Sequence, residues 1–428
     1  MRYFVLAMVI GELLLFGGSG RAVFGEIQAV NKRLISVEDN LRVAEWSYQT
    51  TTAEGDTVRI IKSVLHGGKQ EGVDVVTIDN GRMQIVVVPT RGMSILGVTM
   101  GKIRLGWDSP VREVVHPALI NLQEREGLGW LDGFNEWLVR CGLEFAGHPG
   151  RDSFRDNTGA EAEQTLTLHG KIGNIPASEV QVSIDPNPPH RIRLSGRVDE
   201  RGFYGAALEL ATEVSTLPGS NALEISDAVT NKGAEPQEYE VIYHANFGSP
   251  LLEAGASLAI PLRRLQPMND TAQKALGTFA GIMVPPPGFA RISAPTPGKK
   301  EEVFLIEPLT DPKGRTTVLL QNADKTLGCS VNYSVDKLPF LTIWKNLAPV
   351  RSGYVIGIEP GTNYPFNRSV ERAAGRLKKL KPDETAAFAL EYVLHADSAS
   401  VAKAAEAIAT LNEGYQPTIV PSPPKLSE

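Results

Sequence analysis

The sequence predicts a large all-β protein of antiparallel sheets, with one short helix in mid-chain and another near the C-terminus. Apolar residues alternate with polar ones along several segments, most regularly at Ile192, Leu194 and Val198. A period of two is typical of a strand with one buried face. The chain also contains 41 glycines and 29 prolines, which mark turns between short strands. Many short alternating segments separated by turns indicate antiparallel sheets.

Other segments follow the same pattern less strictly. Residues 222–229 and 237–243 alternate in part, and the apolar run 86–88 ends at Pro89. Residues of the types that form turns lie between the expected strands. The turn candidates are residues 186–189, 217–220 and 231–233.

Two segments depart from the strand pattern. Apolar residues from Trp130 to Cys141 recur at helical spacing, which predicts a helix of about three turns. Residues 398–412 are rich in alanine, with Asp397 or the residue after it as N-cap and Gly414 as the stop signal. The sequence therefore predicts a mid-chain helix and a C-terminal helix.

The bulk composition excludes several classes of function. The net charge of −6 comes without a basic run, so neither nucleic acid nor an anionic membrane surface is an expected partner. Cys141 and Cys329 form no Cys-x-x-Cys pair, which argues against a thiolate zinc site and favours two buried free thiols over a disulfide. Motifs for a serine nucleophile, a nucleotide or a zinc protease are missing. We expect no metal and no cofactor, and the oligomeric state stays open.

The first residues resemble an export signal. Arg2 precedes a mostly apolar stretch, residues 3–16, which Glu12 interrupts, and small residues follow up to Gly25. This predicts a periplasmic or secreted protein that has no contact with the membrane after the signal is removed. The alternative is a start codon assigned too far upstream of a cytoplasmic protein.

The sequence predicts one catalytic domain with short additions at both ends. The expected division is a signal peptide at 1–25, an N-terminal extension at 26–54, the β domain at 55–396, and a C-terminal helix and tail at 397–428.

His244 and Glu359 are the strongest candidates for catalysis. A histidine has an unperturbed pKa of about 6.5 and a glutamate one of about 4.3, so the two suit proton transfer near neutral pH. A sugar ring opens when an acid protonates the ring oxygen while a base removes the proton of the anomeric hydroxyl. Rotation about the C1–C2 bond and closure on the other face give the second anomer. We therefore expect His244 as the acid and Glu359 as the base.

Three segments around these residues resemble the aldose 1-epimerases, the galactose mutarotases. They are Tyr-His-Ala-Asn-Phe-Gly at 243–248, Ile-Glu-Pro-Gly-Thr-Asn-Tyr-Pro at 358–365, and Leu-His-Gly-Lys-Ile-Gly at 168–173. The resemblance spans roughly residues 60 to 395. It implies a β-supersandwich with the site on a concave face, catalysis by His244 and Glu359, and a second histidine, His169, that binds the substrate.

Two further motifs resemble an uncharacterised branch of that superfamily. Arg-Gly-Met occurs at 91–93, and Phe-Asn-Glu-Trp-Leu-Val-Arg-Cys-Gly at 134–142. Galactose mutarotases have an Asn-Arg pair before the His-Gly segment, which this chain lacks, so Arg91 or Arg140 takes that place. The resemblance and the residue types imply further sugar-binding candidates, namely Arg91, His116, Asn135, Glu136, Trp137, Arg140 and Asn246.

Each candidate also has a structural explanation. Glu136 and Arg140 are four residues apart and can form a salt bridge on one helix, and the aromatic residues near them can form a core patch.

The predicted function is a carbohydrate-binding isomerase, similar to aldose 1-epimerases, that acts on a small sugar or oligosaccharide. The alternatives are a carbohydrate-binding protein without catalysis, or a lyase or hydrolase acting on a modified sugar or glycoside. A hydrolase with Glu136 and Glu359 as its two carboxylates belongs to this last group.

Overall fold

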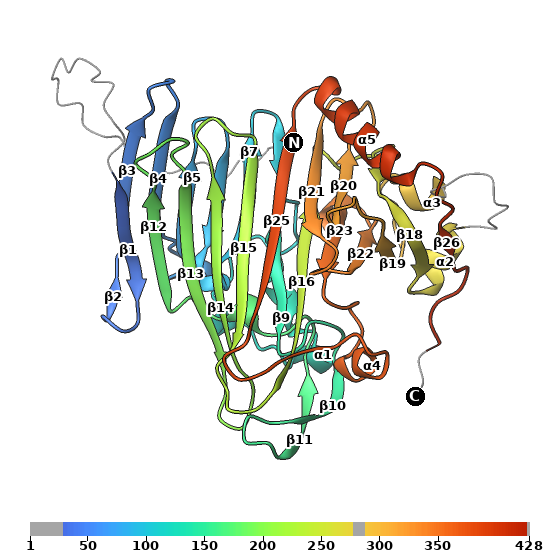
Figure 1. The fold of residues 1–428 in the computed structure, drawn as a ribbon, viewed down its shortest axis with the longest axis horizontal. Helices are drawn as coiled ribbons and strands as arrows, with labels where there is room; N and C mark the ends of the chain where they lie inside the picture. The colour runs from blue at the N-terminus through green and yellow to red at the C-terminus, as the bar shows by residue number, and fades with distance from the viewer. Residues whose placement is uncertain (1–28, 277–286, 426–428) are drawn as a thin grey trace.

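A computed structural model describes residues 29–276 and 287–425. Two large, mostly antiparallel sheets dominate these residues, and they stack face to face (Figure 1). The all-β fold predicted from the sequence is therefore confirmed. The predicted signal peptide, residues 1–25, lies outside the described residues and stays a prediction.

The first sheet has ten strands and contains the longest alternating segments of the sequence. In β13 the alternate residues Ile192, Leu194 and Val198 are buried, as the period of two predicts. The spatial order is β17 (Ser257–Ala259), β20 (Arg315–Gln321), β21 (Gly328–Ser334), β25 (Thr385–His395), β15 (Ala222–Asn231), β14 (Ala207–Thr216), β13 (Ile192–Arg201), β12 (Glu179–Ile184), β1 (Val30–Ser36) and β2 (Leu41–Arg42).

The second sheet has 14 strands. Its main path is β26 (Thr418–Ile419), β18 (Leu262–Pro267), β19 (Glu302–Pro308), β22 (Phe340–Asn346), β23 (Val355–Gly361), β16 (Gln237–Phe247), β9 (Leu138–Leu143), β7 (Ser94–Met100), β6 (Gln84–Val88), β5 (Asp74–Asp79), β4 (Thr57–Val64) and β3 (Trp46–Thr51). Strand β24 (Lys378–Leu380) pairs with β16, and β8 (Ile103–Leu105) pairs with β7. A separate hairpin, β10 (Gly150–Arg155) and β11 (Glu161–Leu166), projects at the lower end of Figure 1.

Helices occupy little of the described chain. The α-helices are α1 (Glu124–Gly127), α2 (Asp270–Leu276), α3 (Pro287–Ala290), α4 (Arg368–Ala373) and α5 (Ser398–Asn412). Single 3₁₀ turns are η1 (Gly68–Gln70), η2 (Pro89–Arg91), η3 (Pro117–Leu119), η4 (Gly129–Asp132), η5 (Ile172–Asn174) and η6 (Val350–Ser352). In the part of the chain that the structure describes, no helix is long and apolar enough to cross a bilayer.

The prediction of a three-turn helix from Trp130 to Cys141 is wrong, because no helix of this length forms there. Only the turn η4 forms at its start, and β9 occupies its end. Every residue of β9 is buried, because other parts of the protein cover both faces of this strand. A strand that is apolar on both faces has no alternation, and its spacing can imitate that of a helix.

Both ends of the described chain join the sheets. Strand β1 pairs with β12 and strand β3 with β4, so the segment predicted as an N-terminal extension contributes to both sheets. Helix α5 has the predicted bounds, and the Asp397 side chain caps it by accepting a hydrogen bond from the Ser400 amide. Val401 and Ile408 of α5 pack against Leu319 of β20.

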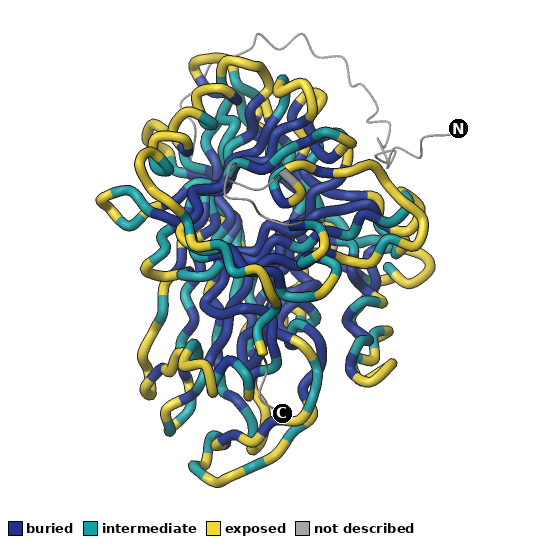
Figure 2. The backbone as a smooth tube through the Cα atoms, turned by 90° about the vertical axis from the view of Figure 1, so that its right-hand side faces the viewer, coloured by how far each residue is buried: buried dark blue, intermediate teal, exposed yellow. Residues whose placement is uncertain are grey.

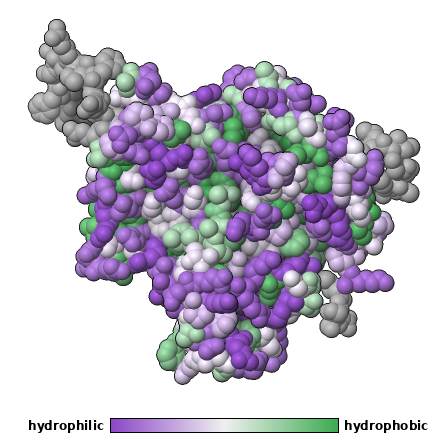
Figure 3. Space-filling model, viewed as in Figure 1, coloured by the Kyte–Doolittle hydropathy of each residue, from purple (hydrophilic) through white to green (hydrophobic). Residues whose placement is uncertain are grey.

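The main hydrophobic core lies between the two sheets, and Figure 2 shows the buried backbone concentrated inside the molecule. Trp137 packs there against Tyr392 of β25, with ring centroids 4.8 Å apart. Cys141 and Cys329 are both buried and free, as the sequence favoured. On the face shown in Figure 3, hydrophilic residues prevail and hydrophobic ones are scattered among them, as is usual for a surface exposed to water.

Candidate functional site

His244 and Glu359 lie side by side on neighbouring strands of the 14-stranded sheet. Strands β16 and β23 pair in antiparallel register, with Ala245 opposite Ile358. The same register places His244 opposite Glu359, and the histidine Nε2 lies 3.2 Å from a carboxylate oxygen, Oε1. The structure therefore brings together the two candidates that are far apart in the sequence.

The alternation of β16 decides which face carries the pair. Tyr243 points to the ten-stranded sheet, where its hydroxyl donates a 2.9 Å hydrogen bond to Asp227. Its neighbour Ala245 also packs in the core between the sheets. Since successive side chains of a strand point to opposite faces, His244 lies on the other face, away from that core.

Burial sets the charge state of the pair. His244 is 4% exposed and Glu359 is 2% exposed. Burial raises the pKa of the Glu359 carboxyl, and the negative charge of Glu301 raises it further. Burial also lowers the pKa of His244, with a contribution from His169. In the site without ligand, these directions favour a proton on the carboxyl and a neutral imidazole.

Both members of the pair keep free hydrogen-bonding capacity. Among the described residues, neither His244 Nδ1 nor Glu359 Oε1 has an aligned hydrogen-bond partner. The 3.2 Å approach between the two side chains is thus a close contact without good hydrogen-bond geometry. Unpaired buried polar atoms are uncommon in proteins, and a ligand hydroxyl is one group that can satisfy them.

His169 joins the pair from a different part of the chain. Its ring centroid lies 5.2 Å from that of His244. Its Nδ1 donates a 3.0 Å hydrogen bond to the carbonyl of Ala146, which leaves Nε2 as a hydrogen-bond acceptor. Burial lowers the pKa of His169 to about 4, so the ring is neutral at physiological pH.

Three aromatic rings surround His244. The centroids of Phe134, Trp344 and Trp130 lie 5.3, 5.6 and 6.1 Å from that of the histidine. Trp344 is only partly buried, and its indole N–H donates a 2.9 Å hydrogen bond to the exposed Glu301. Aromatic faces beside polar groups suit a sugar, whose C–H face is apolar and whose hydroxyls need partners.

Arg91 and Glu136 form a buried ion pair beside the site. The guanidinium donates to Glu136 Oε1 from Nε and Nη2, at 3.0 and 2.7 Å, and to the carbonyl of Gly133 at 3.2 Å. These bonds hold the loop that carries Phe134. Glu136 Oε2 also accepts a hydrogen bond from the amide of Asn135, so both carboxylate oxygens are occupied within the protein.

Asn135 and Asn246 support the same loop. The Asn135 amide group donates to the carbonyl of Glu113 at 2.7 Å. The Asn246 amide group donates to the carbonyl of Glu136 at 3.1 Å. Both predicted binding residues thus have their amide groups bonded to backbone carbonyls near the pair.

Three other candidates are not brought to the pair. Trp137 lies in the core between the sheets, fully buried. Arg140 also points to the ten-stranded sheet and forms a buried ion pair with Asp227. The imidazole of His116 accepts a hydrogen bond from the amide of Ala118 and so caps the turn η3.

Sequence analysis missed Trp344, Glu301 and Gly357. Trp344 and Gly357 occupy opposite positions on β22 and β23, next to the Glu359 position. No local motif marks them, and they reach the site only through the pairing of β19 with β22 and of β22 with β23. No group of three or more side chains suited to a metal ion occurs in the described ranges, 29–276 and 287–425.

Comparison with known protein families shows to which family this chain belongs. Residues 70–394 match the model of the family described as "Domain of unknown function (DUF4432)". The chain belongs to this family. A search of curated proteins found no match.

Solved structures confirm the type of fold. The crystal structure of a "putative aldose 1-epimerase" from Klebsiella pneumoniae subsp. pneumoniae MGH 78578 shares 38% identity with this DUF4432 chain. It superposes with a TM-score of 0.85, over 94% of this chain and all of the other. A galactose mutarotase related enzyme from Lactobacillus acidophilus superposes with a TM-score of 0.50 at 16% identity, over 76% of this chain and 98% of the other. The predicted mutarotase-like fold and superfamily are therefore confirmed.

Proposed function

We propose that this DUF4432 protein is a carbohydrate-binding enzyme that interconverts the anomers of a sugar, as aldose 1-epimerases do. The observation that carries the proposal is the close, buried approach of His244 Nε2 to Glu359 Oε1 on one face of the sheet. A proton donor and a proton acceptor held together beside aromatic rings suit a reaction that consists of proton transfers.

The chemistry needs one donor and one acceptor. The acid gives a proton to the ring oxygen while the base takes the proton of the anomeric hydroxyl, and the C1–O5 bond breaks to give the open-chain aldehyde. After rotation about C1–C2, the base returns its proton to the aldehyde oxygen as C1–O5 forms again. The former acid then recovers the proton of O5. Each turnover therefore leaves the pair in its starting state.

The bound sugar sets the working roles of the pair. In the empty site burial raises the pKa of Glu359, which favours the protonated carboxyl. A sugar hydroxyl that donates a hydrogen bond to this carboxyl stabilises the ionised form. The proton then passes to His244, 3.2 Å away. His244 becomes the acid and Glu359 the base, the roles assigned from the sequence.

His169 and the aromatic rings bind the substrate in this proposal. The neutral His169 offers Nε2 to a sugar hydroxyl, and the ring of Trp344 faces the apolar side of the pyranose. Arg91, Glu136, Asn135 and Asn246 act indirectly by holding the loop that carries Phe134. The name of the Klebsiella pneumoniae relative supports the same reaction class. The expected substrate is a small sugar or oligosaccharide.

Anomer exchange in freshly dissolved sugars tests the proposal. Polarimetry or NMR follows α-glucose, α-galactose and a wider sugar panel with the wild type, His244→Ala and Glu359→Gln. We expect acceleration by the wild type for at least one sugar and a loss of about a hundredfold or more in each variant. The proposal fails if the wild type accelerates none of the sugars.

Two other outcomes identify the alternatives. Stabilisation by a sugar without acceleration would indicate a binding protein, and new products from glycosides would indicate a lyase or hydrolase. The two-carboxylate hydrolase has little support, because Arg91 and the Asn135 amide already engage the Glu136 carboxylate.

A further inference from the structure

We propose that Glu240 is a positioning residue, which holds both His169 and the segment that follows Glu359 in the arrangement that the site needs. The inference rests on the proposed function for its meaning in catalysis, but its structural part can be tested alone. Glu240 lies on β16 four residues before His244 and is completely buried.

One carboxylate oxygen of Glu240 connects to His169. Its Oε2 accepts a 2.8 Å hydrogen bond from the amide of Ala146. The carbonyl of the same Ala146 accepts the hydrogen bond from His169 Nδ1. The next residue, Gly147, accepts a hydrogen bond from the His169 amide through its carbonyl. A single residue, Ala146, thus lies between the Glu240 carboxylate and the His169 ring.

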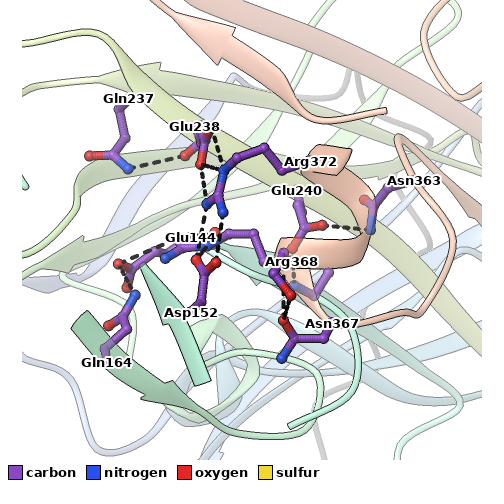
Figure 4. A network of polar contacts seen from close by, with 12 residues as sticks. Glu144, Asp152, Gln164, Gln237, Glu238, Glu240, Asn363, Asn367, Arg368 and Arg372 are labelled. Atoms are coloured by element: carbon purple, nitrogen blue, oxygen red, sulfur yellow. Dashed lines mark hydrogen bonds and ion pairs between the residues drawn. The ribbon is translucent and has the colours of Figure 1, made fainter. Parts of the chain in front are cut away.

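The other oxygen connects to the segment that directly follows β23, the strand that carries Glu359. Oε1 of Glu240 accepts a 2.9 Å hydrogen bond from the side-chain amide of Asn363, as Figure 4 shows. Asn363 follows Glu359 by four residues and also accepts a hydrogen bond from the hydroxyl of Thr362. The Thr362 amide donates in turn to the carbonyl of Val241 on β16. Glu240 therefore joins two segments of the site that are remote in sequence.

The charges around Glu240 come from its own strand and from the region of α4. They belong to Arg368, Glu371, Glu238 and Arg376. Arg368 is already engaged with Asp152 and with the carbonyl of Glu144 (Figure 4). No positive group forms an ion pair with Glu240 among the described residues. Burial, as the largest cause, raises the pKa of Glu240 to about 8.

The ionised carboxylate suits both hydrogen bonds best. Both partners, the Ala146 amide and the Asn363 amide group, are donors, and protonation converts one carboxylate oxygen into an O–H, which is a donor and a weaker acceptor. Protonation therefore weakens one of the two hydrogen bonds. Because the pKa of Glu240 is about 8, we expect this change as the pH falls through about 8.

NMR of the His169 imidazole tests the structural part without any sugar. His169 itself is neutral from pH 6 to 10, so a titration of its ring signals in this range reports a neighbouring group. We expect a shift with a midpoint near pH 8 in the wild type, lost in Glu240→Gln and kept in Glu238→Gln at a lower midpoint, because the charge of Glu238 contributes to the raised pKa of Glu240. The Glu238 carboxylate lies on the same strand but bonds to Arg372. The ring signal of His169 is assigned by its absence from the spectrum of the His169→Asn variant.

Activity provides the second measurement, on whichever sugar the wild type accelerates. We expect kcat/KM of the wild type to rise through pH 8, and that of Glu240→Gln to stay flat and about tenfold lower at pH 9. An unchanged pH profile in Glu240→Gln overturns the inference, as does a wild-type His169 signal that does not shift near pH 8. The wild-type measurement tests the inference even if the Glu240→Gln variant does not fold. A shift that Glu240→Gln abolishes, in a protein that accelerates no sugar, supports the positioning role and rejects only the proposed function.

Discussion

Gly357 lies directly beside the carboxylate of Glu359. A Cβ atom added to Gly357 would lie 2.2 Å from Glu359 Oε1, far inside van der Waals contact. The two residues point to the same face of β23, so the missing side chain of Gly357 creates the space in which the carboxylate meets His244. This glycine is therefore expected to be part of the site although it carries no chemical group.

We predict that Gly357→Ala moves the Glu359 carboxylate away from His244. Because a misplaced acid–base group loses most of its effect, the rate of anomer exchange should fall about tenfold to a hundredfold. Polarimetry with the accelerated sugar measures the change, and circular dichroism checks the fold. Gly97→Ala, also in a strand of this sheet, is the matched control, since its Cβ would lie 3.2 Å from the carbonyl oxygen of Leu105. Full activity in Gly357→Ala would show that the position of Glu359 is unimportant.

His169 should make the protein less stable in mild acid. Its pKa is about 4 in the folded protein and about 6.5 when unfolded. Between these values the unfolded chain binds a proton that the folded chain does not, so the free energy of unfolding falls as the pH falls from 6.5 to 4. The side chain remains partly exposed, and we expect a loss of about 1–2 kcal/mol rather than the full shift.

Urea unfolding at pH 7, 5.5 and 4.5 measures this effect against His169→Asn. His169 has a positive φ of 59°, and asparagine tolerates this conformation better than most residues, so the variant removes the imidazole with little backbone strain. The difference in stability between wild type and variant should shrink toward pH 4.5. A difference that is independent of pH would contradict the lowered pKa.

Much of the fold could be predicted from the sequence because the alternation is local. Strands such as β13 expose one face and bury the other, so the polarity of each residue indicates whether its side chain is buried or exposed. The segment 138–143 lacks this signal because both of its faces are covered, and a helix was wrongly expected there. Helix α5 was predicted with its bounds because its N-cap and its stop signal lie next to the two helix ends in the sequence.

The site was predictable only in part, for a related reason. The motifs around His244 and Glu359 mark these residues, but a motif does not show the direction of each side chain. Trp137 and Arg140 belong to the same sequence motif as Phe134, at residues 134–142, yet they point to the core between the sheets. Trp344 reaches the site through the pairing of β22 with β23, a long-range arrangement that no local pattern reveals.

Arg140 should contribute to stability and not to sugar binding. Its guanidinium and the carboxylate of Asp227 are both about 1% exposed. Removal of one member of a buried ion pair leaves an uncompensated charge and costs about 3–5 kcal/mol. We predict a loss of this size in Arg140→Met, measured by urea unfolding, and a smaller loss in the double variant Arg140→Met with Asp227→Asn. Weaker sugar binding with unchanged stability would instead support the role expected from the sequence.

Trp344 and Trp137 should respond in opposite ways to substitution by alanine. Trp344 lies beside His244 on the site face and is partly exposed. Its removal takes away an aromatic surface worth about 1 kcal/mol in ring contacts, so the dissociation constant of the accelerated sugar should rise about fivefold to tenfold with little change in stability. Trp137 is fully buried in the core, and its removal should cost about 3–5 kcal/mol of stability.

Calorimetric titration with the sugar and urea unfolding, applied to both tryptophan variants, separate the two effects. We expect Trp344→Ala to lose affinity at nearly constant stability. We expect the folded fraction of Trp137→Ala to bind the sugar as tightly as the wild type does. If Trp344→Ala binds with unchanged affinity, the sugar does not contact this ring, and the site must open on a different side of His244.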